Sequence, residues 1–408
     1  MTATISKAGV EMIAGSVTSP KGFRAAGVHC GVKTAKRDLA LVAADRLASA
    51  AALFTTNTVK AAPVLVSQEK IQSGVAQAII INSGNANACT GAQGLGDARD
   101  MAALVARELG IAEEFVLVAS TGVIGSVLSM AATRAGIPRA VQALGPEGGA
   151  DAANAILTTD AYPKMAAAQL EVGGVLVTIG GMAKGAGMIH PNMATTLCVL
   201  TTDAAIPGPQ LREALRKAVD ASFNCISVDG DTSTNDTVFC LANGMSGNAP
   251  LVDHDRAFDQ FSGALAGVAT ALAKMVVRDG EGASRVATLI VRGARSSEEA
   301  KRVATAVMTS PLVKTALGGG EPNWGRVMAA VGRSGAGVHP ERIDMWIGGV
   351  PVVRNGMAAS PDLAAAAAAM RGAEVEMQLD LHLGSGTFTG WFSDLTEAYV
   401  KVNAGYLT

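Results

Sequence analysis

Short runs of apolar and β-branched residues recur along this chain, and each ends at a loop of glycine or small polar residues. The runs cover residues 39–43, 52–57, 78–82, 115–120, 172–179 and 194–201. Runs of this length are typical of buried β-strands. Stretches with helical spacing lie between them, the longest at residues 255–277, whereas residues 22–28 are expected to form a turn. Buried strands interleaved with helices predict a layered fold of the α/β or α+β class.

The composition agrees with closely packed layers of strands and helices. Hydrophobic residues make up 49% of the 408 residues and charged residues only 17%, which argues against disorder. The length suits two domains or one large layered domain. The net charge of −2 provides no basic surface for nucleic acid and no polybasic patch for a membrane. We therefore expect neither a nucleic-acid partner nor a membrane partner.

The cysteines and the apolar stretches indicate where the protein works. Five cysteines are scattered along the chain without a CxxC pair, which is typical of buried thiols in a reducing compartment. The N-terminal residues lack the basic and apolar regions of a signal peptide. The most apolar helical stretch, residues 263–277, contains Lys274 and is shorter than a membrane span. These features predict a cytoplasmic protein.

A glycine-rich loop meets a buried-strand pattern at Ala194-Thr195, within residues 184–204. An Ala-Thr pair before a strand is common, so these residues alone favour a structural role. A threonine inside a chain is a poor nucleophile because its hydroxyl has no adjacent base. If Thr195 attacked the Ala194 carbonyl and water released the ester, its new α-amine, with a pKa of about 7.7–8.0, could serve as that base. Thr196 is one position out of register and is expected to face the opposite side of the strand.

Three other segments are candidate site components. Thr121-Gly122 ends an apolar run and could offer a hydroxyl and a backbone N–H to an oxyanion, although most such pairs are ordinary turns. Residues 228–237 are dense in short polar side chains, but their spacing does not match a calcium loop, so a polar turn that lines a site is favoured. Glu281 lies between two glycines and is either presented to a site or a solvated residue at a helix end. No histidine or cysteine cluster has zinc spacing, and we predict no metal.

Long stretches of the chain resemble the ArgJ family of ornithine acetyltransferases, also called bifunctional glutamate N-acetyltransferases. The resemblance extends over essentially the whole chain, which makes it specific. The stretches are GFRAAGVHCGVK (22–33), FTTNTVKAAPVL (54–65), INSGNANACTG (81–91), ASTGVIG (119–125), GMIHPNMATTLCVLTTDA (187–204), SFNCISVDGDTSTNDT (222–237), DGEGAS (279–284), EPNWGRVMAAVGRSG (321–335) and VKVNAGYLT (400–408).

The resemblance implies a self-cleaving enzyme with a fold like that of N-terminal-nucleophile proteins, layered as α/β/β/α. The precursor would be cut between Ala194 and Thr195 into an α chain, residues 1–194, and a β chain, residues 195–408. Both chains would contribute to the site, and assemblies of two α and two β chains are typical of the family. The resemblance implies no cofactor, and it leaves open whether acetyl-CoA also serves as a co-substrate.

The resemblance also implies the reaction and its residues. N-acetylornithine would give its acetyl group to Thr195, and glutamate would then accept it, in a ping-pong reaction of arginine biosynthesis. Thr121 and Gly122 correspond to the oxyanion hole. The substrate-contact positions correspond to Thr158 (or its neighbour Thr159), Lys184, Thr195, Glu281, Asn403 and Thr408.

Two positions depart from the family pattern, and two other functions compete with the transferase. Thr196 replaces a methionine after the predicted cut, and His190 stands where alanine is more usual. Both changes could alter the rate of cleavage or the choice of acceptor. The nearest rival function is an N-terminal-nucleophile amidohydrolase or aminopeptidase, in which water resolves the acyl-enzyme. A non-enzymatic amino-acid-binding module is the third class.

Overall fold

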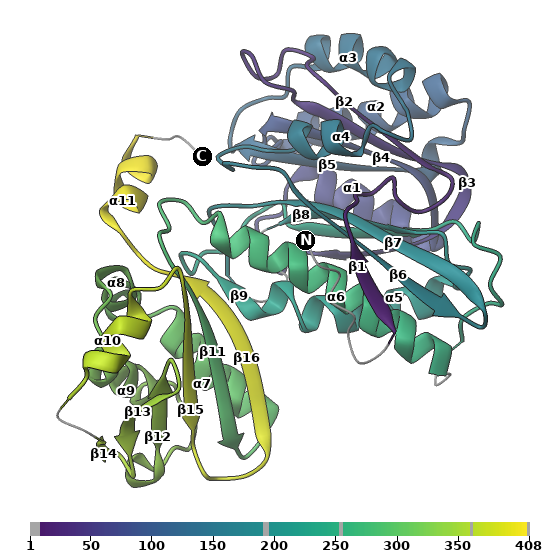
Figure 1. Ribbon diagram of the computed structural model, residues 1–408. Helices are drawn as coiled ribbons and strands as arrows, with labels where there is room; N and C mark the ends of the chain where they lie inside the picture. The colour runs from purple at the N-terminus through teal and green to yellow at the C-terminus, as the bar shows by residue number, and fades with distance from the viewer. Residues whose placement is uncertain (1–8, 191–195, 253–255, 360–361, 406–408) are drawn as a thin grey trace.

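A computed structural model describes residues 9–190, 196–252, 256–359 and 362–405. Within these residues the strands form two sheets, one of nine strands and one of seven (Figure 1). The larger sheet has the strand order β1-β6-β7-β8-β10-β3-β4-β5, and β2 pairs with β3 off this path. Its strands are β1 (Val10–Ile13), β2 (Phe23–Val28), β3 (Leu39–Phe54), β4 (Val75–Asn85), β5 (Val116–Val123), β6 (Lys164–Val172), β7 (Val175–Lys184), β8 (Leu197–Thr202) and β10 (Thr237–Ala242).

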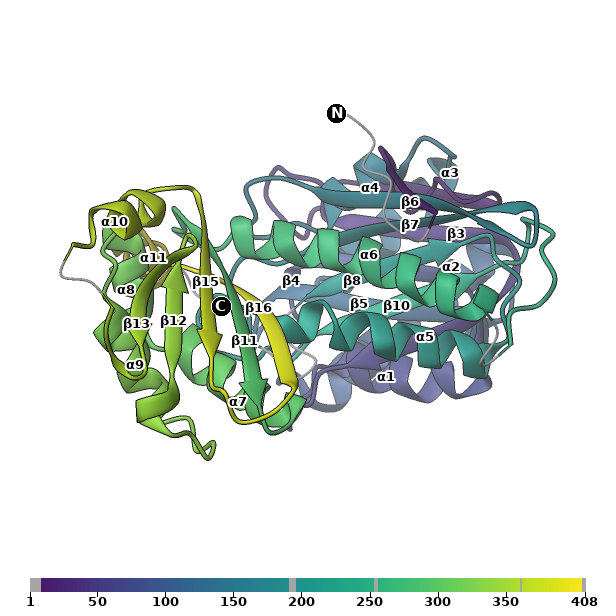
Figure 2. The ribbon, with the colours of Figure 1, turned by 60° about the horizontal axis from the view of Figure 1, so that its bottom comes forward.

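Among the described residues, six helices pack on the larger sheet. They are α1 (Ala62–Lys70), α2 (Gly91–Leu109), α3 (Met130–Gln142), α4 (Gly149–Ala155), α5 (Gly208–Asp220) and α6 (Arg256–Arg278). The short 3₁₀ helices η1 (Ile71–Ser73), η2 (Glu113–Phe115) and η3 (Phe223–Cys225) join some of these elements. Figure 2 shows α5 and α6 side by side along one face of the sheet.

The larger sheet folds over itself, so that its two halves face each other. Side chains of β7, β8 and β10, such as Met182, Val199 and Phe239, share one core with Ile79 of β4 and Leu117 of β5. On the outer side of the first half, α5 and α6 form a second core with β7, β8 and β10. On the outer side of the other half, α1, α2 and α3 form a third core with β3, β4 and β5. The order of layers is α/β/β/α, which confirms the predicted fold class.

Two local predictions were wrong because strand pairing outweighed local sequence. Residues 22–28 were expected to form a turn, but β2 pairs antiparallel with β3 over its whole length, from Phe23↔Ala44 to Val28↔Leu39. The runs at 39–43 and 52–57 were expected to be separate strands. Residues 39–43 and 52–54 belong to one 16-residue strand, β3, because neighbouring strands provide backbone partners along both stretches. The rest of the second run, residues 55–57, lies outside any strand.

The longest helix, α6, is long and apolar enough to cross a membrane by length and composition. It has 23 residues, and its most apolar window has a mean hydropathy of 1.3 with 56% of that window buried. The helix exceeds the length expected for its apolar stretch because the helical turns continue through the polar residues at both ends. Its apolar face packs against β6, β7 and α5, so packing within the fold accounts for its hydropathy.

The smaller sheet is made almost wholly of residues that follow α6. Its order is β14-β13-β12-β15-β11-β16-β9, and α7, α8 and α9 contribute to its core. Its elements are β9 (Ile226–Ser227), β11 (Val286–Ala294), α7 (Ser297–Met308), α8 (Pro311–Gly319), α9 (Trp324–Gly332), η4 (Pro340–Arg342), β12 (Asp344–Ile347), β13 (Val350–Arg354), β14 (Met357–Ala358), α10 (Ala364–Met370), β15 (Glu374–Asp380) and β16 (Gly386–Ser393). The last helix, α11 (Glu397–Ala404), stands apart from the others and has no buried residue (Figure 1).

The boundary predicted at residues 194/195 does not separate the two sheets. It lies in the connection between β7 and β8, which are antiparallel neighbours from Ile179↔Thr202 to Lys184↔Leu197. Strand β8 continues the sheet through β10 to β3. The two predicted chains would therefore share one sheet, and the division into chains remains a prediction about cleavage rather than about folding units.

Candidate active site

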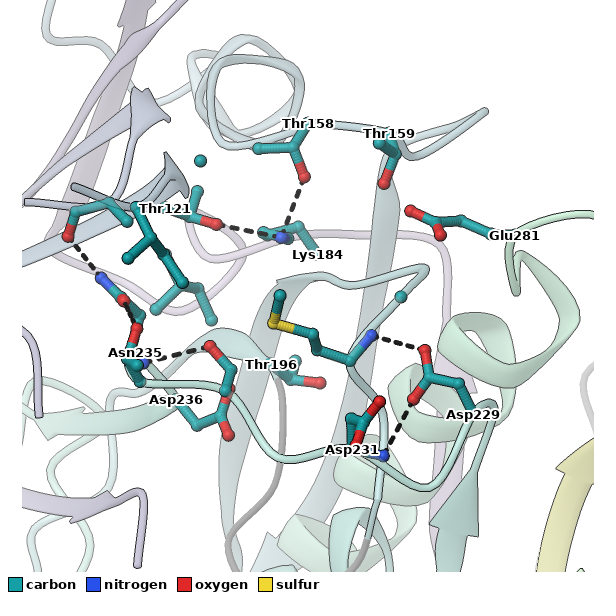
Figure 3. Close-up of a pocket in the computed structure, with 18 of the residues that line it drawn as sticks. Thr121, Thr158, Thr159, Lys184, Thr196, Asp229, Asp231, Asn235, Asp236 and Glu281 are labelled. Atoms are coloured by element: carbon teal, nitrogen blue, oxygen red, sulfur yellow. Dashed lines mark hydrogen bonds between the residues drawn. The ribbon is translucent and has the colours of Figure 1, made fainter. Parts of the chain in front are cut away.

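A cavity of about 260 Å³ lies where β5, β7 and β8 meet the C-terminal helix α11. Most of its lining side chains are polar or charged. Figure 3 shows Lys184 near Thr121 and Thr158 on one side of the cavity, and Asp229 and Asp231 on the other side. In this view Thr196 lies between Lys184 and Asp231. The volume is just below the range of about 300–1,000 Å³ that is usual for drug-sized ligands. The cavity therefore suits a small polar molecule such as an amino-acid derivative.

Thr121 and Gly122 lie side by side at the end of β5 and line the cavity. Gly122 has φ +135°, and a Cβ there would lie 2.3 Å from the backbone carbon of Gly84 in β4. Only glycine fits that backbone and that close approach. The Thr121 hydroxyl oxygen accepts a hydrogen bond from Lys184 Nζ at 3.0 Å, so its own hydrogen is available to an acceptor elsewhere. This arrangement gives a donor at the place where an oxyanion hole was predicted.

Lys184, the last residue of β7, links the two predicted threonines. Its Nζ donates to Thr121 Oγ1 at 3.0 Å and to Thr158 Oγ1 at 3.0 Å. Burial lowers the pKa of Lys184, and the nearby Asp160 acts in the opposite direction. Because Thr158 binds Lys184, it is the better candidate of the doublet, although Thr159 also lines the cavity.

A buried carboxylate that the sequence did not indicate supports this wall of the cavity. Asp160 Oδ1 accepts hydrogen bonds from the Gly185 N–H at 2.7 Å and from Lys164 Nζ at 2.7 Å. Its Oδ2 accepts from the Thr158 N–H at 3.0 Å. Burial would raise the pKa of Asp160, but Lys184 and Lys164 outweigh burial and hold the pKa at about 2. Asp160 is therefore an anion throughout the physiological range.

Two residues before the predicted cut, Met188 and Ile189, are hydrogen-bonded to the polar segment 228–237. Asp229 accepts from the Met188 N–H at 2.7 Å and from the Ile189 N–H at 2.9 Å. Met188 has φ +56°, a conformation that residues other than glycine seldom adopt. The two hydrogen bonds help to hold it there. Burial raises the pKa of Asp229, and the segment lines the cavity, as the sequence favoured.

Glu281 reaches the cavity from the segment that follows α6. Its backbone N–H donates to the Ala186 carbonyl at 2.9 Å. Its carboxylate Oε2 accepts from Asn403 Nδ2 of α11 at 2.8 Å. Tyr399 of the same helix also lines the cavity, and burial first, then the charges of Asp229 and Glu281, raise its pKa to about 12. Helix α11 thus brings two polar side chains to a site formed mainly by the larger sheet.

The charges of the cavity suit a zwitterion. One lysine, Lys184, and several carboxylates line it: Asp229, Asp231, Asp236 and Glu281. A bound amino acid could pair its carboxylate with the lysine and its ammonium with a carboxylate. In the described part of the chain, no three His, Cys, Asp or Glu side chains are placed so that they could hold a metal ion together.

Six of the predicted site residues come together around this cavity. They are Thr121, Gly122, Thr158, Lys184, Glu281 and Asn403. Ala194, Thr195 and Thr408 lie outside the described residues. Thr196 lines the cavity. It was expected to face the side of the strand opposite to Thr195, and that expectation stays a prediction because Thr195 lies outside the described residues.

Sequence reasoning missed Lys164, Asp160, Asp279 and Tyr399. Lys164 begins a strand of small apolar residues, so it looks like a solvated strand end. Its partner Asp279 is 115 positions away, and no local pattern connects them. The one sequence feature that could have pointed to Lys164 is its charge at the edge of an apolar run.

Comparison with known proteins shows the family of this chain. A model of the ArgJ family matches residues 24–408. The chain belongs to the ArgJ family. An arginine biosynthesis bifunctional protein ArgJ from Symbiobacterium thermophilum is 52% identical over 402 residues, covering 98% of this chain and 100% of the relative. The protein of the same name from Geobacter sulfurreducens is 49% identical over 390 residues, covering 95% and 99%.

Solved structures of ArgJ proteins are also similar in sequence. One, an arginine biosynthesis bifunctional protein ArgJ from Bacillus halodurans, is 47% identical and covers 47% of this chain and 99% of its own, with a TM-score of 0.43. Another, an ornithine acetyltransferase complexed with ornithine from Mycobacterium tuberculosis, is 42% identical and covers 45% and 98%, with a TM-score of 0.42. Membership of the ArgJ family confirms the resemblance, and the protein is an acyltransferase of arginine biosynthesis.

Proposed function

We propose that this protein moves an acetyl group from N-acetylornithine to glutamate through an acetyl ester on Thr195, after cutting its own chain between Ala194 and Thr195. Membership of the ArgJ family supports the overall reaction. The observation that carries the proposal is the single cavity that brings Thr121, Lys184 and Glu281 together. Thr196, which follows Thr195 in the sequence, lines the same cavity.

The proposed first half-reaction begins with attack of Thr195 Oγ on the acetyl carbonyl. The α-amine of Thr195 takes the hydroxyl proton, and Oγ forms a bond to the carbonyl carbon. The oxyanion that develops accepts hydrogen bonds from the Thr121 hydroxyl and the Gly122 N–H, each worth about 3 kcal/mol in comparable sites. The C–N bond then breaks, the proton passes to the leaving nitrogen, and ornithine departs.

The second half-reaction reverses these steps with glutamate. Its amine attacks the acetyl ester, the same donors hold the oxyanion, and Thr195 Oγ leaves with a proton. Lys184 would pair with the α-carboxylate that donor and acceptor share. Glu281 would pair with the side-chain ammonium of the donor, so the amine of glutamate stays free to attack. Asn403 holds the Glu281 carboxylate, and Thr408 would complete the substrate contacts.

We further propose an assembly of two α and two β chains in the cytoplasm. All five cysteines of the chain are free thiols, and four of them are buried, which fits a reducing compartment. A second acetyl donor, acetyl-CoA, is consistent with the bifunctional relatives. Its use would show as N-acetylglutamate formed from acetyl-CoA and glutamate.

The test combines intact mass with a transfer assay. We expect the purified protein to consist of two pieces that correspond to 1–194 and 195–408. It should release ornithine from N-acetylornithine at a rate that depends on glutamate, with parallel double-reciprocal plots. Thr195→Ala should remain one chain and lose transfer by at least about 10³-fold.

The aminopeptidase or amidohydrolase alternative predicts a different dependence on the acceptor. Ornithine release at the same rate without glutamate would contradict the transferase. A single uncut chain with unchanged activity in Thr195→Ala would contradict the nucleophile.

A further inference from the structure

Lys164 is a fully buried lysine that lies outside the cavity. It begins β6, and its side chain has no exposed surface. Its Nζ donates to Asp160 Oδ1 at 2.7 Å, to Asp279 Oδ2 at 2.5 Å and to the Tyr162 carbonyl at 3.3 Å. An ammonium has three hydrogens, so this set satisfies all of them. One buried cation is thus shared by two carboxylates from distant segments.

The first carboxylate holds the wall that carries Lys184. Asp160 accepts a hydrogen bond from the Gly185 N–H at 2.7 Å, and Gly185 directly follows Lys184. It also accepts from the Thr158 N–H at 3.0 Å, and the Thr158 hydroxyl in turn accepts from Lys184. Asp160 therefore fixes the lysine wall at two points.

The second carboxylate holds the segment that carries Glu281. Asp279 directly follows the last residue of α6 and lies two residues before Glu281. Its Oδ2 also accepts from the Ala161 N–H at 3.0 Å, beside Asp160. The short link through Gly280 makes the position of Glu281 depend on that of Asp279.

We propose that Lys164 is a positioning residue for acetyl transfer, which sets the separation between Lys184 and Glu281 by pairing with Asp160 and Asp279 together. The inference rests on the proposed transferase function. The two charged groups of the cavity pair with opposite charges on one small zwitterion, whose charges are a fixed number of bonds apart. The separation of the two walls therefore decides how well the zwitterion binds.

Loss of Lys164 would change this separation rather than leave the walls in place. Asp160 and Asp279 each lie within 2.7 Å of the same Nζ. Without the ammonium they face each other as like charges in a buried site, where such repulsion is strong. The lost bridge and this repulsion would each let the two segments move apart, so Glu281 would leave its position opposite Lys184.

The test is Lys164→Met, which keeps the side-chain length and removes the charge. The rate of transfer from N-acetylornithine to glutamate is measured well below the melting temperature. It is divided by the concentration of protein whose Thr195 can be acetylated. We expect the KM for N-acetylornithine to rise at least tenfold. Lys217→Met is the matched control, because it removes a lysine that pairs with Glu213 at 2.7 Å on α5, away from the cavity, and its KM should stay within twofold of the wild type.

Two further variants separate positioning from mere stabilisation. Lys164→Met combined with Asp279→Asn removes the repulsion but does not restore the bridge between the two segments. The melting temperature should therefore recover while the KM stays at least tenfold raised. Asp279→Asn alone leaves Lys164 paired with Asp160, and it provides the kinetic test if Lys164→Met does not fold. We expect it to raise the KM at least threefold.

A KM within twofold of the wild type in folded Lys164→Met, or in Asp279→Asn where the first does not fold, would overturn the inference. Recovery of the KM together with the melting temperature in the double variant would overturn it as well. A wild-type protein that transfers no acetyl group would instead contradict the proposed function, so the two failures are distinguishable.

Discussion

A glycine at position 187 lets the carboxylate of Glu281 reach the cavity wall. A Cβ at this position would lie 2.7 Å from Glu281 Cδ and Oε2 and 2.8 Å from Oε1. The contact is with the end of a flexible side chain, so a methyl group would displace the carboxylate rather than the backbone. At the scale of single residues, the absence of one carbon atom determines where the negative charge lies.

Gly187→Ala should therefore damage binding and leave folding intact. We expect the KM for N-acetylornithine to rise about tenfold, which corresponds to a loss of about 1.4 kcal/mol, with little change in the melting temperature. The measurement is steady-state kinetics beside a thermal melt.

Gly263→Ala on α6 is the control for this substitution. A Cβ at Gly263 would meet no atom within 4 Å, and alanine favours a helix interior by about 0.5–1 kcal/mol. It should raise the melting temperature without changing the KM. An unchanged KM in Gly187→Ala would contradict the close contact with Glu281.

A buried lysine also occurs beside the smaller sheet, where α8 contacts the end of β16. Lys314 Nζ donates to the Ser393 carbonyl, and its Oγ lies 3.4 Å away. Burial lowers the pKa of Lys314 from 10.5 to about 8, although Asp394 acts in the opposite direction. At the scale of elements, the contact between this helix and this strand contains a cation that is costly to bury.

The stability of the protein should depend on pH through this lysine. Below about pH 8 the folded and unfolded chains both carry the Lys314 proton. Between that pH and 10.5 only the unfolded chain keeps it, so the contribution of Lys314 to the free energy of unfolding rises with pH. The full change is about 3 kcal/mol.

Lys314→Met isolates this contribution. Urea unfolding of the wild type and the variant at pH 7 and pH 10.5 gives the difference in free energy at each pH. We expect the wild type to gain about 2–3 kcal/mol relative to the variant between the two values. A difference that does not change with pH would show that Lys314 keeps its proton in the folded state.

At the scale of the whole molecule, strands from both predicted chains belong to the same sheet. Strand β7, before the predicted cut, pairs with β8 after it, and β10 pairs with β3. The central core mixes side chains from both sides of the cut. Cleavage would break one covalent bond and leave these contacts in place.

The cut protein should therefore behave as one particle until it is denatured. We expect two bands on a denaturing gel but a single peak in size-exclusion chromatography, with uncut Thr195→Ala in the same peak. Separate elution of the pieces without denaturant would contradict the shared sheet. Urea should release both pieces in one cooperative transition, because they share one core.

Much of the fold could be predicted from local pattern because burial and helical spacing are local properties. The helical spacing predicted the longest helix at residues 255–277, and α6 spans Arg256–Arg278. The family resemblance depends on long motifs and likewise needs no tertiary information. Thr121, Lys184 and Glu281 became candidates in this way.

Tertiary structure decided what no local pattern contains. Strand β2 exists because β3 provides its hydrogen-bond partners, and Lys164 bridges two carboxylates because the fold brings residues 115 positions apart into contact. The polarity and periodicity of a segment indicate whether it prefers burial, but they do not indicate which distant segment it contacts. The family motif at residues 187–204 therefore predicted the chemistry without tertiary information, whereas the geometry of the cavity follows from the packing of the four layers.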